Sequence, residues 1–86
     1  MAIKLLESHF AILQVVCDET NYDPTTWLSE EVIIQRHKTV FREFVHDLVA
    51  ELWRDEYLEC KDSKTGDRMV RITQRGVDAV LDKLRG

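Results

Sequence analysis

The residues that decide the fold are WRDEYLECKDSKTGDRMVRIT, from Trp53 to Thr73. Across this stretch the hydrophobic pattern changes from a helical repeat to alternation at every second residue. Leu58 and Cys60 alternate with charged residues, and a second alternating run follows the polar segment 62–67. Alternation of this kind is typical of half-buried strands, and polar residues with glycine are typical of turns. The stretch therefore predicts a hairpin with strands at about 57–61 and 68–73.

Helical patterns lie on both sides of this hairpin. From Val40 to Asp55, apolar residues recur at helical spacing and form one stripe: Phe41, Phe44, Val45, Leu48, Val49 and Leu52. Thr39 is the predicted N-cap of this helix. After the hairpin, Thr73 is expected to cap a last helix over residues 74–84, because its apolar residues again follow helical spacing.

The first part of the chain predicts two more helices. Residues 3–18 carry an apolar arc over about half of the helix surface, which indicates burial against more than one neighbour. His9 lies inside this arc and is expected to be a partly buried, hydrogen-bonded core residue. Residues 19–28 are mostly polar, so a turn region is expected there. Ser29 followed by two glutamates predicts the N-cap of a short helix over residues 29–36.

The composition predicts one small domain over residues 1–86, because 44% hydrophobic and 33% charged residues are ordinary for a globular chain. The apolar runs are too short for a transmembrane helix and no signal segment opens the chain, so a cytoplasmic protein is expected. Cys17 and Cys60 are expected to be reduced thiols, and no Cys or His spacing indicates a metal site or a cofactor. The sequence carries no Gly-rich phosphate loop and no common catalytic motif, so we expect no enzyme activity.

The order helix, short helix, long helix, hairpin, helix is that of a winged helix-turn-helix domain. This is an α+β fold with three helices, a two-stranded antiparallel wing and a C-terminal helix. Over roughly residues 26–84 the chain resembles MarR-like regulators in three segments. Residues 48–58 resemble the end of a recognition helix that enters the first wing strand, and Asp67-Arg68 resembles a wing tip. Residues 72–76 resemble the junction where a threonine caps the last helix and a glycine permits close packing. Glu56 stands where this family often has glycine.

Charge is spread unevenly along the chain. The formal net charge is −4, with five basic and eleven acidic side chains in residues 1–56 and five basic and three acidic ones in residues 57–76. An acidic chain is not a general nucleic-acid binder, but its basic wing segment can contact phosphate. The outward face of helix 40–55 carries acids that DNA repels: Glu43, Asp47 and Glu51.

Two functions follow from the resemblance and the charge pattern. In the first, the chain is a small transcriptional or prophage-type regulator that binds double-stranded DNA. The resemblance and the helix pattern place its contacts at the start of the recognition helix and in the wing: Lys38, Thr39, Arg42, His46, Lys64 and Arg68. Arg42 would contact a guanine edge, and Lys64 and Arg68 would reach a phosphate or the minor groove.

In the second function, the domain binds a protein partner. The acidic helix face suits a basic partner, and the first helix, Trp27 and Trp53 supply apolar contact surface. The first helix is also the best candidate for a homodimer interface, because its apolar arc is broad. The alternative is that the core of this small domain uses the whole arc.

Overall fold

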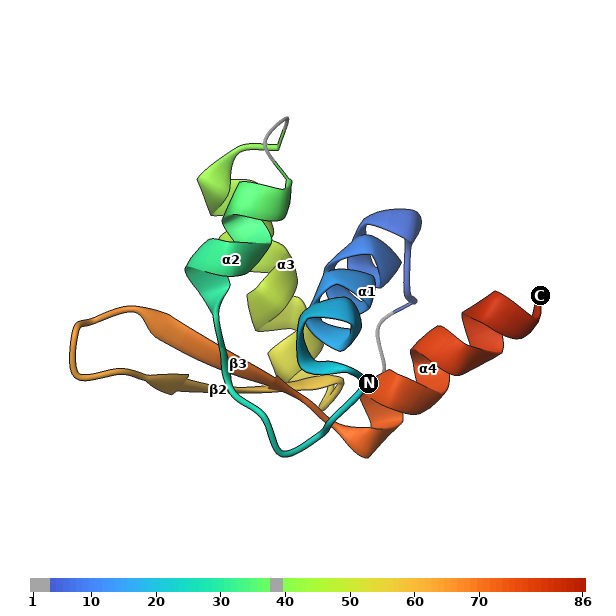
Figure 1. Cartoon of the computed structure of the whole chain (residues 1–86). Coiled ribbons are helices and arrows are strands. Elements are labelled where there is room, and N and C mark those ends of the chain that lie inside the picture. The colour runs from blue at the N-terminus through green and yellow to red at the C-terminus, as the bar shows by residue number, and fades with distance from the viewer. Residues whose placement is uncertain (1–3, 38–39) are drawn as a thin grey trace.

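The computed structural model describes residues 4–37 and 40–86 (Figure 1). These residues form α1 (Glu7–Thr20), β1 (Leu28–Ser29), α2 (Glu30–Arg36), α3 (Arg42–Arg54), β2 (Leu58–Asp62), β3 (Arg68–Ile72) and α4 (Gln74–Arg85). The α+β class and the predicted order of helices and hairpin are confirmed. The hairpin of β2 and β3 extends to one side of the helices, and α4 extends to the other side (Figure 1).

The core lies where α1 packs against α3 and α4 and where these helices contact the sheet. The four helices and the two strands of the hairpin contribute fully buried side chains to it: Leu13, Val16, Ile33, Val49, Leu52, Leu58, Val70, Ile72 and Val80. Each such side chain contributes about 1.5–3 kcal/mol when buried, so the hairpin is stabilised by the helices that it contacts. His9 is also buried, and its Nδ1 accepts a hydrogen bond from the Leu6 N–H at 3.0 Å, which confirms its predicted role.

The sheet has three strands, where the sequence predicts two. β1 pairs antiparallel with β3, which pairs antiparallel with β2 on its other side. A strand of two residues is too short to produce an alternating pattern, so residues 19–28 predict only a turn region. Leu28 lies opposite Val70 and Ser29 lies opposite Met69. Through this pairing, the segment before α2 is hydrogen-bonded to β3, the central strand of the sheet.

Helix α3 begins at Arg42, later than the sequence predicts. Its N-cap is Phe41, so the prediction that Thr39 caps this helix is wrong. Four members of the predicted apolar stripe are buried: Val45, Leu48, Val49 and Leu52. Phe41 and Phe44, at the start of the helix, are instead 83% and 50% exposed. Helix α1 also begins later than predicted, at Glu7.

The junction between the hairpin and α4 matches the expected arrangement. Thr73 is the N-cap of α4, and its Oγ1 accepts from the Gly76 N–H at 3.0 Å and donates to the Glu56 carbonyl oxygen at 2.6 Å. A Cβ at Gly76 would lie 2.4 Å from the Tyr57 carbonyl oxygen, so glycine permits this close packing. Glu56 has φ 66°, the left-handed region that favours glycine. The corner therefore takes a conformation suited to glycine although its residue is glutamate.

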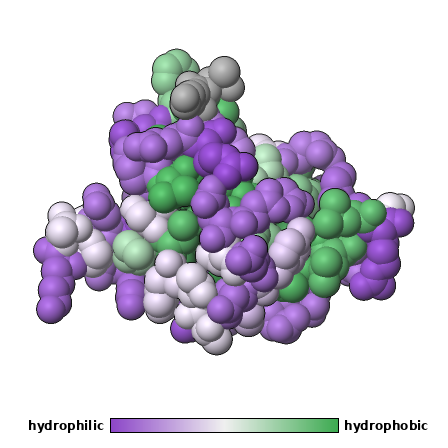
Figure 2. Space-filling view, in the orientation of Figure 1, coloured by the Kyte–Doolittle hydropathy of each residue, from purple (hydrophilic) through white to green (hydrophobic). Residues whose placement is uncertain are grey.

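Helix α4 leaves part of its apolar side uncovered. Val77 and Val80 are buried, as predicted, but Leu81 and Leu84 are 39% and 62% exposed. Figure 2 shows apolar surface on the side of the molecule where α4 lies. Leu6, just before α1, is 55% exposed as well. Nothing within the described residues covers these leucines.

Both cysteines are free thiols, as the sequence predicts. Cys17 is buried and Cys60 is half-buried, and burial raises the pKa of each thiol to about 11. At neutral pH both side chains therefore behave as small, unreactive apolar groups. Among the described residues, no helix has the length and apolar character needed to cross a membrane.

Candidate nucleic-acid interface

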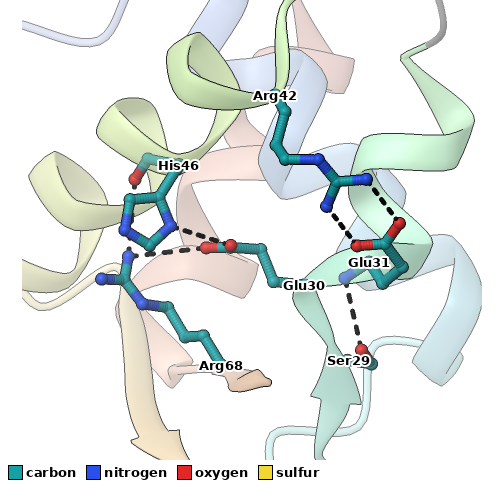
Figure 3. A network of polar contacts seen from close by, with 6 residues as sticks. All are labelled: Ser29, Glu30, Glu31, Arg42, His46 and Arg68. Atoms are coloured by element: carbon teal, nitrogen blue, oxygen red, sulfur yellow. Dashed lines mark hydrogen bonds and ion pairs between the residues drawn. The ribbon is translucent and has the colours of Figure 1, made fainter. Parts of the chain in front are cut away.

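Two carboxylates at the start of α2 meet the polar side chains predicted to contact DNA (Figure 3). Ser29 is the N-cap of α2, and its Oγ accepts a hydrogen bond from the Glu31 N–H at 3.3 Å. Acidic side chains are favoured at this helix end, because it carries partial positive charge. Since Ser29 lies opposite Met69 in the sheet, the next residue, Glu30, comes close to Arg68 at the start of β3.

Glu30 connects α2 to α3 and to the hairpin. Its Oε1 lies 2.9 Å from Nδ1 of His46, and its Oε2 accepts from Nη1 of Arg68 at 3.4 Å. The same Arg68 nitrogen donates to the His46 carbonyl oxygen at 3.4 Å, and the guanidinium lies 5.9 Å from the centre of the Trp53 ring. The side chains of Glu30 and Arg68 are only 9% and 19% exposed. A carboxylate this buried requires polar partners, so these contacts hold three elements together.

A second ion pair joins the first residue of α3 to α2. Arg42 donates from Nη1 and Nη2 to the two carboxylate oxygens of Glu31, at 2.5 and 2.9 Å. These hydrogen bonds lower the pKa of Glu31 and raise the pKa of Arg42. Both side chains are well exposed, so solvent and salt weaken the pair. In the free protein, the guanidinium that the sequence predicts for a guanine edge is bound to Glu31.

The other predicted contact residues lie elsewhere. Lys64 is exposed in the loop at the tip of the hairpin, between β2 and β3. Lys38 and Thr39 lie outside the described residues. The structure therefore brings Arg42, His46 and Arg68 to the side of α3 that faces α2 and β3, and it leaves Lys64 at the end of the wing.

Acidic side chains border this surface. Glu43 and Asp47 are exposed on α3, as the sequence predicts. Glu51 instead turns towards α1, where its Oε1 lies 3.5 Å from Nε2 of His9. Only two of the three predicted acids thus remain on the outward face, where they reduce the positive potential around Arg42 and His46.

Basic residues of the hairpin also have partners within the molecule. Trp27 lies against both Lys61 and Arg71, whose cationic groups are 4.2 and 4.7 Å from its ring centre. Arg71 also forms an ion pair with Glu59. Cations stacked on a tryptophan ring are attracted by its π electrons. Half-buried Trp27 therefore has a local role, in holding cations on the outer face of the sheet.

Sequence patterns identify Glu30 and Glu31 as residues at a helix start, but not as partners of Arg68 and Arg42. These pairs are 38 and 11 residues apart in the chain, and the first depends on the unpredicted strand β1. The carboxylates are thus the part of the site that sequence reasoning missed. Among the described residues, no group of three or more His, Cys, Asp or Glu side chains could hold a metal ion.

The sequence matches no protein-family model and no curated protein. Among solved structures, the chain is similar to RosR of H. salinarum, with a TM-score of 0.79 and 18% sequence identity. The similarity covers 99% of this chain and 76% of the RosR chain. At this level of identity it shows a shared fold, in agreement with a winged-helix-like arrangement, and it assigns no role to individual residues.

Proposed function

We propose that this chain is a DNA-binding winged-helix module, as in a small transcriptional or prophage-type regulator. The observation that carries the proposal is that Arg42, His46 and Arg68 lie on the side of α3 that faces α2 and β3. In helix-turn-helix proteins, the N-terminal residues of the recognition helix contact base edges in the major groove. Arg42 is the first residue of α3, so it has the position of a base-reading side chain.

Each predicted contact has a distinct role in this proposal. Arg42 binds a guanine edge with both guanidinium nitrogens, and Glu43 accepts from a cytosine amino group. Arg68 and Lys64 contact phosphate or the minor groove from the wing, which contributes affinity without sequence preference. His46, together with Lys38 and Thr39 ahead of α3, completes the proposed contact surface.

The test is the salt dependence of binding to a mixed-sequence duplex. Three phosphate contacts would reduce the affinity by roughly tenfold to a hundredfold between about 50 and 200 mM salt. Arg68→Ala should weaken binding to every duplex, whereas Arg42→Ala should weaken preferred sites most. Arg85→Ala is the matched control, because it removes an equal charge from an exposed position at the end of α4. Absence of binding by the wild type at 50 mM salt would reject the proposal.

A second candidate function is binding of a basic protein partner. It is favoured by three exposed aromatic residues of one segment, Phe41, Phe44 and Trp53, which are 83%, 50% and 47% exposed. Exposed Glu43 and Asp47 add negative charge beside them. Aromatic residues are enriched in protein interfaces, and complementary charge speeds association. The test is binding of a Lys- and Arg-rich helical peptide. This function would be favoured if the wild type binds the peptide, Phe41→Ala and Phe44→Ala do not, and DNA binding is absent.

A homodimer is part of the DNA-binding proposal. Regulators of this kind bind two half-sites with two-fold symmetry. The exposed leucines Leu6, Leu81 and Leu84 supply an apolar surface for a second copy, and the 2.5 Å ion pair between Lys83 and Glu7 ties α4 to the start of α1 beside it. Sedimentation should show a dimer that becomes a monomer in Leu84→Asp. A wild type that remains monomeric at high concentration would contradict this part.

A further inference from the structure

We infer that Glu30 and Glu31 are internal competitors of DNA, which hold Arg68, His46 and Arg42 in the free protein and release the arginines when DNA binds. The inference rests on the proposed DNA-binding function and adds a control of affinity to it. Its basis is that each carboxylate occupies the hydrogen-bonding groups that a DNA contact would use (Figure 3).

At Arg42 the competition is for both guanidinium nitrogens. Nη1 and Nη2 each donate to one oxygen of Glu31, at 2.5 and 2.9 Å. A guanine edge or a phosphate takes the same parallel pair of N–H groups. Arg42 therefore cannot make a two-bond contact with DNA until Glu31 has left. The side chains of Arg42 and Glu31 are 59% and 40% exposed, so little desolvation energy opposes the exchange of Glu31 for DNA.

At Arg68 the competition is less open to solvent. Its guanidinium reaches Glu30, the His46 carbonyl oxygen and the Trp53 ring, and its side chain is 19% exposed. Salt screens such a pair less than an exposed one. When Arg68 turns to a phosphate, Glu30 retains His46 at 2.9 Å as a hydrogen-bond partner. The imidazole therefore keeps the buried carboxylate from being left without a partner, which makes the exchange feasible.

The experiment compares three variants that remove one negative charge each. Glu30→Gln and Glu31→Gln remove the competitors, whereas Asp47→Asn removes an exposed carboxylate of α3 that is outside both ion pairs. Binding to a mixed-sequence 20-base-pair duplex is measured at about 50 and 200 mM salt. At low salt we expect both glutamine variants to bind about fivefold more tightly than the wild type, and Asp47→Asn at most about twofold.

The pairs are then identified by double variants. The gain from Glu30→Gln should disappear in an Arg68→Ala background, and the gain from Glu31→Gln should disappear in an Arg42→Ala background. The crossed combinations should keep their gains, because each carboxylate restrains its own arginine. Simple loss of negative charge would instead give the same gain in every background.

The outcomes separate the inference from the proposed function. If the wild type binds DNA and neither glutamine variant exceeds Asp47→Asn, the competition is overturned and DNA binding stands. If neither the wild type nor any variant binds at 50 mM salt, both are rejected. Because Glu30 is buried, circular dichroism must show that Glu30→Gln is folded. If it is not, exposed Glu31 and its Arg42 background decide the question.

Discussion

Gly76 shows how a missing side chain permits the close approach of α4 to Tyr57, in the segment between α3 and β2. A Cβ there would lie 2.4 Å from the Tyr57 carbonyl oxygen and 2.7 Å from Cδ1 of Ile72. We therefore expect Gly76→Ala to lower the free energy of unfolding by about 2 kcal/mol, although alanine is the better helix former. Urea unfolding measures the change. Ala79→Gly in the same helix is the control. A Gly76→Ala variant as stable as the wild type would contradict the close contact.

Glu56 carries a backbone strain that a single substitution should relieve. Its φ of 66° costs a residue with a Cβ about 1–2 kcal/mol, whereas glycine takes this conformation freely. Glu56→Gly should raise the free energy of unfolding by roughly 0.5–1 kcal/mol, because the greater freedom of glycine in the unfolded chain offsets part of the relief. Glu56→Ala is the control, since alanine keeps the strain. Equal stability of the two variants would show that the strain is absent.

At the scale of elements, one hydroxyl joins the start of α4 to the corner between α3 and β2. Thr73 Oγ1 accepts from the Gly76 N–H and donates to the Glu56 carbonyl oxygen. Thr73→Val keeps the shape of the side chain and removes both contacts, so the free energy of unfolding should fall by about 1–2 kcal/mol. Thr73→Ser should recover most of it. If thermal unfolding gave Thr73→Val the same stability as the wild type, the result would argue against the cap.

The elements that the sequence predicts well are those with local signals. The hairpin, the Ser29 and Thr73 caps and the order of helices follow from periodicity and capping residues. β1 and the start of α3 were missed for different reasons. β1 is only two residues long and forms by pairing with distant β3, and α3 begins after Phe41, whose aromatic side chain gives no capping signal. A local sequence pattern does not predict pairing between residues that are far apart in the chain.

The candidate site divides in the same way. The sequence predicts Arg42, His46 and Arg68 one by one, from helix position and from the wing resemblance, and they lie on the side of α3 that faces α2 and β3. Their contacts with Glu30 and Glu31 were not predictable, because ion pairs form between side chains that only the tertiary fold brings together. Whether these residues touch DNA stays a prediction.

The whole molecule should lose stability at alkaline pH through its two thiols. Burial raises the pKa of Cys17 and Cys60 from 9.0 to about 11, so the folded state holds these protons more tightly than the unfolded state. The associated stability is present below pH 9 and is lost as the pH rises towards 11. A double alanine variant should show a flatter decrease of the free energy of unfolding over this range. Parallel curves for the two proteins would contradict the pKa shifts.

Ser29 belongs to two elements at once, since its backbone pairs with Met69 of β3 and its side chain caps α2. A force that bends the hairpin must therefore either tilt α2 together with the hairpin or break the pairing of β1 with β3. In the first case, Glu30 and Glu31 travel with the wing relative to α3. A mechanical load on the hairpin would then move Glu31 relative to Arg42, its ion-pair partner on α3.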